Sequence, residues 1–499
     1  MKSKVFVFFV IVFFTLSIVP IVNLVLGVKK FKVKYLYNID FIIPKLNGFL
    51  YDYGLNAYPG QVVIGKNNWL YLGDDYADTI TLAREGIDPS YIKNAIAKKN
   101  KLDAWDGFFK SKGVKDFKIL VGPNKSSVYP EFLPDWVKLS ESRKINILME
   151  STNSEYYIYP ENILLSAKEI YEGHDLYHKT DTHWNNLGAW VVFDHFIKEI
   201  KIKNPEINYN QNILLKRPVE ISAGDLSGFL RLTGSLKDQQ QIIEFLPSFD
   251  VETECHTFYA GEKIECVGNP KIISQKEPLL VTATGSLNDK KLLWIRDSFG
   301  TAMSQYMART FSNVIQVHYD NLDKDKLIDI VEDFKPDYVF MTIVERSIDG
   351  GLPLEYPETG LAKDNMYSYS SELIASNDLE KKDDGFYISG EDPFLIYKLE
   401  REVDGEFNDT VAISLMCDGY EKESVDIQVF WKKNENDNFS EVNSARYLIS
   451  QGISYVEPSL NSNWNSEESI QYLRLDIESS SINKCMKFNI KNLVFNKSL

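Results

Sequence analysis

Three residues in two distant stretches have the types needed for acyl-transfer chemistry. Asp181 and His183 stand two positions apart in KTDTHWNNLGAW, and Ser298 lies in KLLWIRDSFG. Side chains two positions apart in an extended segment share one face, so the aspartate could hold one imidazole nitrogen and leave the other free as a base. A serine hydroxyl needs such a base to act as a nucleophile. The pattern predicts a serine nucleophile, a histidine base and an orienting aspartate.

The same residues also permit two other interpretations. Asp181 could cap the helix that follows it, with His183 packed in the core, and Ser298 could be a helix cap as well. A crowded run of histidines and aspartates could instead ligate a metal ion: His174, Asp175, His178, Asp181 and His183. A hydrolytic metal site usually gathers ligands from several strands, and no other carboxylate stands out, so we predict no metal site.

Five further residues are candidates for substrate contact, because each would lie near a strand end or beside the Asp–His segment. They are Arg296, Lys125, Tyr129, Tyr177 and Arg346. Lys125 and Tyr129 follow the apolar strand FKILVGP, and Arg346 ends the strand DYVFMTIVER. Each type has a structural alternative, which is a solvated lysine, a packed tyrosine, or an arginine paired with the acidic residue next to it.

The elements around Ser298 indicate how these residues are positioned. Leu292–Ile295 is a short apolar run that reads as a buried strand, followed by the turn RDSFG and the helical stretch TAMSQYMARTF. A strand, a helix and a strand follow in SNVIQVHYD, DKDKLIDIVEDF and DYVFMTIVER. This alternation predicts a parallel sheet with helices on both faces, and ligands of such sheets bind at the carboxyl ends of the strands. Ser298 would lie at that edge.

Length and composition allow several domains with real cores. The chain has 499 residues, of which 44% are hydrophobic and 13% aromatic. We expect an α/β domain at 35–380, with an insertion or cap near 203–285, and a polar linker at 350–385. Short strands at regular spacing predict a β-sandwich at 386–499.

The N-terminus predicts membrane association. Residues 5–27 carry no charge, and a helix of that length spans the ~30 Å hydrocarbon core of a bilayer. We expect 1–34 to be an uncleaved single-pass anchor, with a cleaved signal peptide as the alternative. Two lysines precede the apolar run and four closely follow it, so charge does not fix its orientation. The cysteines below favour an extracytoplasmic body.

Charge and cysteine usage narrow the class of protein further. The formal net charge is −16, and no basic face follows the N-terminus, which argues against nucleic acid as a partner. The four cysteines contain no C-x-x-C pair, so a structural zinc site is not expected. An even number in an exported chain fits disulfides, and proximity in the sequence favours Cys255–Cys266 and Cys417–Cys485.

Four motifs in order resemble the alginate O-acetyltransferase family of the AlgX and AlgJ type, which is an SGNH-hydrolase-like group. They are KNNWLYLGDD, VGPNKSSVYPEFLP, LYHKTDTHWNNLGAW and LLWIRDSFGTAM, within about residues 60–350. The resemblance implies that Asp181, His183 and Ser298 form a triad. Two features depart from the usual SGNH pattern: Arg296 replaces the glycine before Asp-Ser, and the aspartate and histidine precede the serine, as they do in the alginate group.

The resemblance implies the following function. The protein would move acetyl groups onto hydroxyls of an extracytoplasmic polysaccharide, without a cofactor, using acetyl supplied by a membrane-bound O-acyltransferase partner. Some members carry a C-terminal carbohydrate-binding β-sandwich, which 386–499 would match. A carbohydrate acetyl esterase and a non-catalytic polysaccharide-binding protein of an export complex are the alternatives. Beyond the Ser298 N–H, no oxyanion donor is assigned from the sequence.

Overall fold

A computed structural model gives the fold of the 499-residue chain. It describes residues 2–497 except 26–36, 38–41, 87–90, 152–155, 249, 266–276, 353–366, 369–370, 383–384, 404–408, 420–424, 450–451, 457–463, 465–468 and 483.

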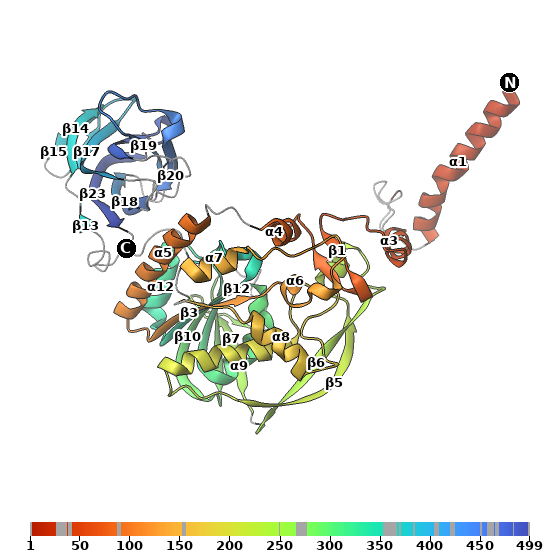
Figure 1. Ribbon diagram of the computed structural model, residues 1–499. Helices are drawn as coiled ribbons and strands as arrows, with labels where there is room; N and C mark the ends of the chain where they lie inside the picture. Colours follow the sequence, from red (N-terminus) through yellow and green to blue (C-terminus); the bar gives the residue numbers. More distant parts are fainter. Residues whose placement is uncertain are drawn as a thin grey trace.

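An eight-stranded sheet forms the centre of the structure (Figure 1). Its strands, in spatial order, are β4 (Tyr157–Ile158), β3 (Asp116–Gly122), β12 (Tyr338–Val344), β10 (Asn288–Arg296), β11 (Phe311–His318), β9 (Leu279–Thr284), β7 (Glu252–Thr257) and β8 (Lys263–Ile264). The first five are parallel, as predicted. The last three pair antiparallel, so the sheet is mixed. These three come from the segment expected to be an insertion, which therefore extends the sheet.

Helices cover both faces of this sheet, and the alternation along β10 shows why. Leu292 and Trp294 point into one apolar cluster, whereas Leu293 and Ile295 point into a second cluster on the opposite face. A strand buried on both sides reads as a continuous apolar run, which is how the sequence revealed it. The first face is covered by α8 (Glu161–Ile170), α9 (Asn186–Lys203) and α11 (Ser304–Thr310), and the second by α5 (Tyr91–Ser111), α7 (Lys144–Ser151) and α12 (Lys324–Phe334).

A smaller group of elements lies beside the sheet. It contains the hairpin β1 (Val62–Ile64) and β2 (Leu70–Leu72), the hairpin β5 (Asn212–Ser222) and β6 (Lys237–Leu246), and the helices α3 (Ile43–Asp52), α4 (Thr79–Glu85) and α10 (Asp225–Phe229). Leu70 of β2, Leu226 of α10 and Tyr51 of α3 share one apolar cluster. The turn that joins β5 to β6 is thereby fixed against the N-terminal hairpin.

Two antiparallel sheets make up the C-terminal part. One contains β15 (Leu379–Lys382), β16 (Gly385–Ile388), β23 (Cys485–Lys497), β18 (Asp409–Gly419), β21 (Gly452–Val456) and β13 (Tyr367–Ser368); the other contains β14 (Ser371–Asn377), β17 (Phe394–Val403), β22 (Ile470–Ile477), β19 (Val425–Lys432) and β20 (Ser444–Ile449). Phe488 of the first and Leu473 of the second belong to one buried cluster, so the sheets pack as a sandwich. The strands β13 to β15 lie in the stretch expected to be a linker.

The aromatic residues of this sandwich serve its core. Trp431 and Trp464 are fully buried, with ring centroids 5.1 Å apart. Cys485 is buried in the same cluster, and Cys255, on β7 of the central sheet, is buried in the cluster on one face of that sheet. Cys266 and the side chain of Cys417 lie outside the described residues, so both disulfide pairings stay predictions.

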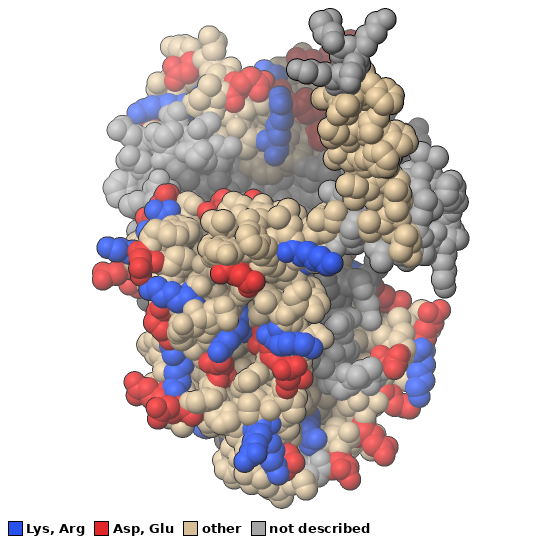
Figure 2. Space-filling model, turned by 90° about the vertical axis from the view of Figure 1, so that its right-hand side faces the viewer, with Lys and Arg blue, Asp and Glu red and all other residues tan. Residues whose placement is uncertain are grey.

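The chain begins with the apolar helix α1 (Lys2–Val25). Among the described residues, it is the one helix whose length and composition suit a membrane span, over Val5–Asn23, and the apolar side chains of that stretch are mostly exposed. Such a helix can be an anchor or a signal sequence. Figure 2 shows the apolar stretch of α1 as a tan column, above a face on which both charge signs are interspersed.

Candidate active site

A continuous chain of hydrogen bonds joins the three residues with predicted chemistry. His183 Nδ1 lies 2.6 Å from Asp181 Oδ1, and His183 Nε2 lies 2.7 Å from Ser298 Oγ. An ionised carboxylate only accepts, so Nδ1 carries the proton and Nε2 is left to accept from the serine hydroxyl. The side chains of His183 and Asp181 are 25% and 23% exposed, so the chain of bonds reaches the surface.

The turn that carries Ser298 is fixed by the residue before it. Asp297 Oδ1 accepts from the N–H of Phe299 at 2.8 Å, and its Oδ2 accepts from the N–H of Val344 at 2.7 Å. The carboxylate therefore ties the end of β10 to the end of β12. Burial raises the pKa of Asp297, and those two N–H donors oppose the rise. The turn itself is a 3-10 helix, Ser298–Met303, rather than the start of an α-helix.

Gly300 allows this turn to close. A Cβ at this position would lie 2.3 Å from Arg296 Cδ and 2.9 Å from Trp294 Cζ2. Both neighbours are fully buried and have no space to move into. The turn after β10 therefore depends on close packing.

The segment that carries Asp181 and His183 is a short loop closed on itself. The N–H of His178 donates to the carbonyl of His183, and Tyr177 bridges to Trp184. Helix α9 then begins with Asn185, whose side chain accepts from the N–H groups of the next turn. Asn185, and not Asp181, is therefore the helix cap, and the capping interpretation of Asp181 is wrong.

One contact brings the loop and the turn together. Trp184 Nε1 donates to the carbonyl of Phe299 at 2.9 Å, and the two rings meet edge to face with centroids 4.9 Å apart. Each residue directly follows a member of the triad in the sequence. The contact therefore sets the separation of His183 and Ser298.

Asp225 is a neighbour of the triad that the sequence did not reveal. Its carboxylate accepts from the N–H of Thr182 at 2.8 Å and from Thr182 Oγ1 at 2.6 Å, and its own N–H donates to Asp181 Oδ2 at 3.1 Å. Gly224, just before it, approaches so closely that a Cβ would lie 2.2 Å from Asp181 Cβ. Asp225 lies in the irregular region near 203–285, where no periodicity singles it out.

Lys125 braces the same loop from inside the protein. It begins α6 (Lys125–Val128), and its Nζ donates to the carbonyls of His178, Lys179 and Asp181 at 3.0, 3.2 and 2.6 Å. The side chain is buried beneath the face of Trp69. Burial lowers the pKa of Lys125 to about 8, although nearby carboxylates, Asp181 first, oppose the shift. The structure thus places Lys125 against the loop backbone instead of in an open cleft.

The two tyrosines predicted to contact substrate also lie inside. Tyr129 OH accepts from the N–H of Leu176 at 2.8 Å, and Tyr177 OH donates to the carbonyl of Pro123 at 2.6 Å. Both side chains are buried, and their rings meet edge to face. Their position supports the loop from behind, which is the packed alternative that the sequence left open.

Arg296 is likewise enclosed. Its guanidinium donates to Gln316 Oε1 at 2.8 Å, to Thr301 Oγ1 at 3.0 Å and to the backbone carbonyl of Asp297 at 3.0 Å. Burial lowers the pKa of Arg296 to about 9, with the charge of Asp297 acting against it. The side chain is fully buried, which is incompatible with the predicted substrate contact in this conformation.

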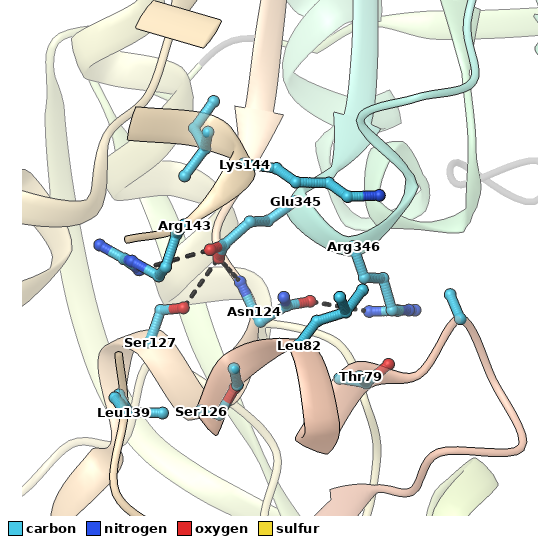
Figure 3. Close-up of a pocket in the computed structure, with 13 residues that line it drawn as sticks. Thr79, Leu82, Asn124, Ser126, Ser127, Leu139, Arg143, Lys144, Glu345 and Arg346 are labelled. Atoms are coloured by element: carbon cyan, nitrogen blue, oxygen red, sulfur yellow. Dashed lines mark hydrogen bonds and ion pairs between the residues drawn. The ribbon is translucent and has the colours of Figure 1, made fainter. Parts of the chain in front are cut away.

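Arg346 is the predicted contact residue that faces open space. It lines a hollow of about 500 Å³, part of it open to solvent, together with Asn124 and Glu345 (Figure 3). Arg346 Nη1 donates to Asn124 Oδ1 at 3.3 Å, and the guanidinium lies over the ring of Phe299. A smaller hollow is lined by Arg346, Asn124 and Thr182, so it borders the residue next to His183.

Glu345 does not pair with the arginine that follows it. Its carboxylate accepts from the N–H of Asn124 and from Ser127 Oγ, both at 2.8 Å, and from Arg143 at 3.3 Å (Figure 3). Burial raises the pKa of Glu345, and Arg143 counteracts it. Arg346 is therefore left with no carboxylate partner among the described residues.

Opposed shifts in pKa suit His183 to the role of a base. Burial would lower the pKa of His183, but the hydrogen bond and charge of Asp181 and the charge of Asp225 outweigh it and raise the pKa. Burial would raise the pKa of Asp181, but its bonds with His183 outweigh that effect and hold the pKa well below its usual range. The imidazolium form is thus stabilised beside an aspartate that stays ionised.

The crowded histidines and aspartates of HDLYHKTDTH do not converge. His174 Nδ1 contacts Gln241 Oε1 at 2.8 Å, and His178 Nδ1 lies 3.8 Å from Asp238. Within the described part of the chain, the acidic and histidine side chains close enough to share an ion are Asp181, His183 and Asp225. In that group His183 Nδ1 is already engaged with Asp181, which fits a triad.

Comparison with known families supports the resemblance seen in the motifs. Residues 62–256 match the SGNH hydrolase-like domain of the acetyltransferase AlgX. The predicted resemblance to this family is confirmed over that segment. The AlgX-like segment contains Asp181 and His183, whereas Ser298 lies beyond it. No curated protein matches the chain.

Solved structures similar to the chain include the following three. Bacillus cereus PatB1 is 13% identical with a TM-score of 0.42, covering 59% of this chain and 99% of its own. The O-acetyltransferase domain of Pseudomonas putida AlgJ is 14% identical with a TM-score of 0.36, covering 58% and 92%. A DHHW family protein from Eubacterium siraeum is 17% identical with a TM-score of 0.37, covering 58% and 95%.

Proposed function

We propose that this protein transfers acetyl groups onto hydroxyls of an extracytoplasmic polysaccharide through an acyl-enzyme on Ser298. The observation that carries the proposal is the chain of bonds from Asp181 through His183 to Ser298. A hydroxyl that donates to a free imidazole nitrogen, with the other nitrogen held by a carboxylate, has the arrangement of a serine nucleophile. The match to an acetyltransferase domain supports the choice of acyl group.

In the first half-reaction, Ser298 Oγ attacks the carbonyl carbon of an acetyl donor while its proton passes to His183 Nε2. The tetrahedral intermediate collapses as His183 returns that proton to the leaving group, and the acetyl ester of Ser298 remains. In the second half, a sugar hydroxyl gives its proton to His183 Nε2 and attacks the ester carbonyl. The proton then returns to Ser298 Oγ, so both halves balance. Asp181 stays ionised and stabilises the imidazolium throughout.

The polar lining beside the triad supplies the substrate contacts in this proposal. Arg346 has donors to spare, because its hydrogen bond to Asn124 engages only one of its five N–H groups. It would contact the acyl oxygen or a polar group of the substrate. Together with Asn124 it lines the hollow next to Thr182, and hence next to His183. The reaction needs no cofactor, and a membrane-bound O-acyltransferase would supply the acetyl group.

The N-terminal helix and the C-terminal sandwich also have roles in this proposal. Helix α1 would anchor the body to the membrane on its extracytoplasmic side, and the C-terminal sandwich would hold the glycan. Its buried tryptophans are unsuited to stacking on sugar rings, so contacts with glycan would come from other residues of the sandwich. An esterase would use the same triad with water in place of the sugar hydroxyl, and the partial exposure of His183 admits water.

The test combines an acetyl donor ester, an acceptor polysaccharide and the full-length protein. Transfer predicts acetylated polysaccharide and a trappable acetyl ester on Ser298, whereas an esterase would yield free acetate alone. Ser298→Ala should lower turnover by on the order of 10⁴-fold, because the nucleophile is lost. Ser312→Ala, at a half-buried position of β11, is the matched control. Unchanged turnover in Ser298→Ala would refute the proposal and leave a glycan-binding role.

A further inference from the structure

Helix α3 presents an apolar stripe to the outside of the molecule. Ile42, Leu46, Phe49 and Tyr53 follow one another at helical spacing and are 39%, 54%, 58% and 70% exposed. The rings of Phe49 and Tyr53 pack together with centroids 4.8 Å apart. Large apolar side chains that share one face of a helix usually mark a surface that something covers.

The opposite face of α3 is fixed to the body. Asn47 is buried, and its Nδ2 donates to the carbonyl of Leu230 at 2.8 Å. Tyr51 packs against the cluster that contains Leu226 and Leu230. The helix is therefore held by its inner face, and the stripe faces outward because the helix cannot rotate without losing these contacts.

The sequence before α3 indicates what covers the stripe. The apolar helix α1 ends at Val25, and only 16 residues separate it from Ile42. The intervening chain contains four lysines and one aspartate, and α3 adds Lys45 and Asp52, so the local net charge is positive in a protein of net charge −16. Apolar and aromatic side chains next to lysines match the boundary between acyl chains and anionic headgroups.

We propose that α3 lies in the interface of an anionic membrane, with Ile42, Leu46, Phe49 and Tyr53 inserted among the lipids. The bilayer is favoured over a protein partner because the stripe is continuous in sequence with a helix suited to span it. The stripe is one helix face wide, which is the form of a helix that lies along a membrane surface. With α1, it gives the body two attachments to the membrane in place of one.

Two attachments fix how the catalytic body faces the membrane. The carbonyl that receives Asn47 belongs to Leu230, just after α10, and α10 begins with Asp225, whose carboxylate holds Thr182. One short helix therefore separates the membrane contact from the triad. This consequence rests on the proposed acyl transfer, because a membrane-bound acetyl donor would have to reach Ser298. The proposed position of α3 in the membrane interface does not rest on acyl transfer.

A fluorescent probe at the stripe tests the proposal. Full-length Phe49→Cys would be labelled with an environment-sensitive maleimide dye and reconstituted into nanodiscs of phosphatidylcholine and phosphatidylglycerol. Ile202→Cys is the matched control, since Ile202 is an apolar residue 74% exposed at the end of α9. Labelled wild-type protein provides the blank for the native cysteines. We expect blue-shifted emission at position 49, quenching by lipids that carry a shallow spin label, and little quenching by aqueous iodide.

The other outcomes would overturn the proposal. Iodide quenching at position 49 equal to that at position 202 would place α3 in water. Protection from both iodide and spin-labelled lipid would mean that protein covers the stripe. Neither result depends on acetyl transfer, so a failure here is distinct from a failure of Ser298→Ala to abolish turnover.

Discussion

The two halves of the triad are held by different forces. The loop that carries Asp181 and His183 is braced by polar groups from other segments, including Lys125 and Asp225. The turn that carries Ser298 is held mainly by close packing around Gly300 and by the capping carboxylate of Asp297. The position of the base therefore depends mainly on polar groups from other segments together with the close approach of Gly224, and the position of the nucleophile depends on tight packing together with one carboxylate.

Two glycine substitutions should have the largest effects, and together they test this contrast between the two halves of the triad. Gly224→Ala would push a methyl group against Asp181, and displacing the triad by about 1 Å can cost on the order of 10²-fold in turnover. Gly300→Ala would overpack fully buried Arg296 and Trp294 and should cost about 1–3 kcal/mol in the free energy of unfolding.

Turnover of a chromogenic acetyl ester and denaturant unfolding of both variants would separate the effects. Gly224→Ala should lose more activity than stability, and Gly300→Ala should lose stability at least as severely as activity. If the two variants showed the same ratio of losses, the distinction between the halves would not hold.

A third test is a substitution of Lys125. Lys125→Met keeps the volume but removes a donor from three partly buried loop carbonyls, of which that of Lys179 still accepts from the N–H of Leu70; each carbonyl left unsatisfied costs about 1–3 kcal/mol. Because the lysine acts through the loop, kcat should fall while KM changes little. Lys125→Arg retains donors and should recover part of kcat. A rise in KM with kcat unchanged would restore the original prediction of substrate contact.

The smallest effect is a shift in the pH profile. His183 must be neutral to accept a proton, so turnover should rise with pH through the pKa of His183, which its carboxylate neighbours raise above 6.5. Asp225→Asn removes one of the charges that raise this pKa, so the acid limb should move to lower pH. Asp238→Asn is the control, because Asp238 bonds to Thr180 in the same loop without contributing to the pKa of His183. Equal shifts in both variants would point to loosening of the loop.

Much of the central sheet could be read from the sequence. Strands β10, β11 and β12 are continuous apolar runs separated by a helix with clear periodicity, and burial on both faces produces that pattern. Asp181, His183 and Ser298 stood out because their types are chemically specific. Their meeting is a tertiary contact: Ser298 follows β10 at the carboxyl edge of the sheet, and the bond from Trp184 to Phe299 joins its turn to the loop of His183.

The residues that brace the site could not be predicted from the sequence, for a physical reason. Asp225 contacts Thr182 across 43 positions, and Lys125 contacts Asp181 across 56, so neither contact leaves a local spacing to detect. The place of β7, β8 and β9 in the central sheet was not predicted, because β7 has a single buried residue and β9 alternates buried and more exposed residues in a polar region. Arg296 was predicted to contact substrate, but the structure buries it. Burial of a guanidinium depends on the partners that surround it, and one of them, Gln316, is 20 positions away in the sequence.

The indole bond from Trp184 to Phe299 also determines when the molecule becomes reactive. His183 and Ser298 are separated by 115 positions, and nothing local holds either one near the other. An unfolded chain thus carries an ordinary alcohol and an ordinary imidazole, inert toward any activated ester that it meets during synthesis or transport. The hydroxyl of Ser298 gains its base only in the folded sheet, once the indole N–H of Trp184 donates to the carbonyl of Phe299. Folding of the protein therefore controls when Ser298 becomes a nucleophile.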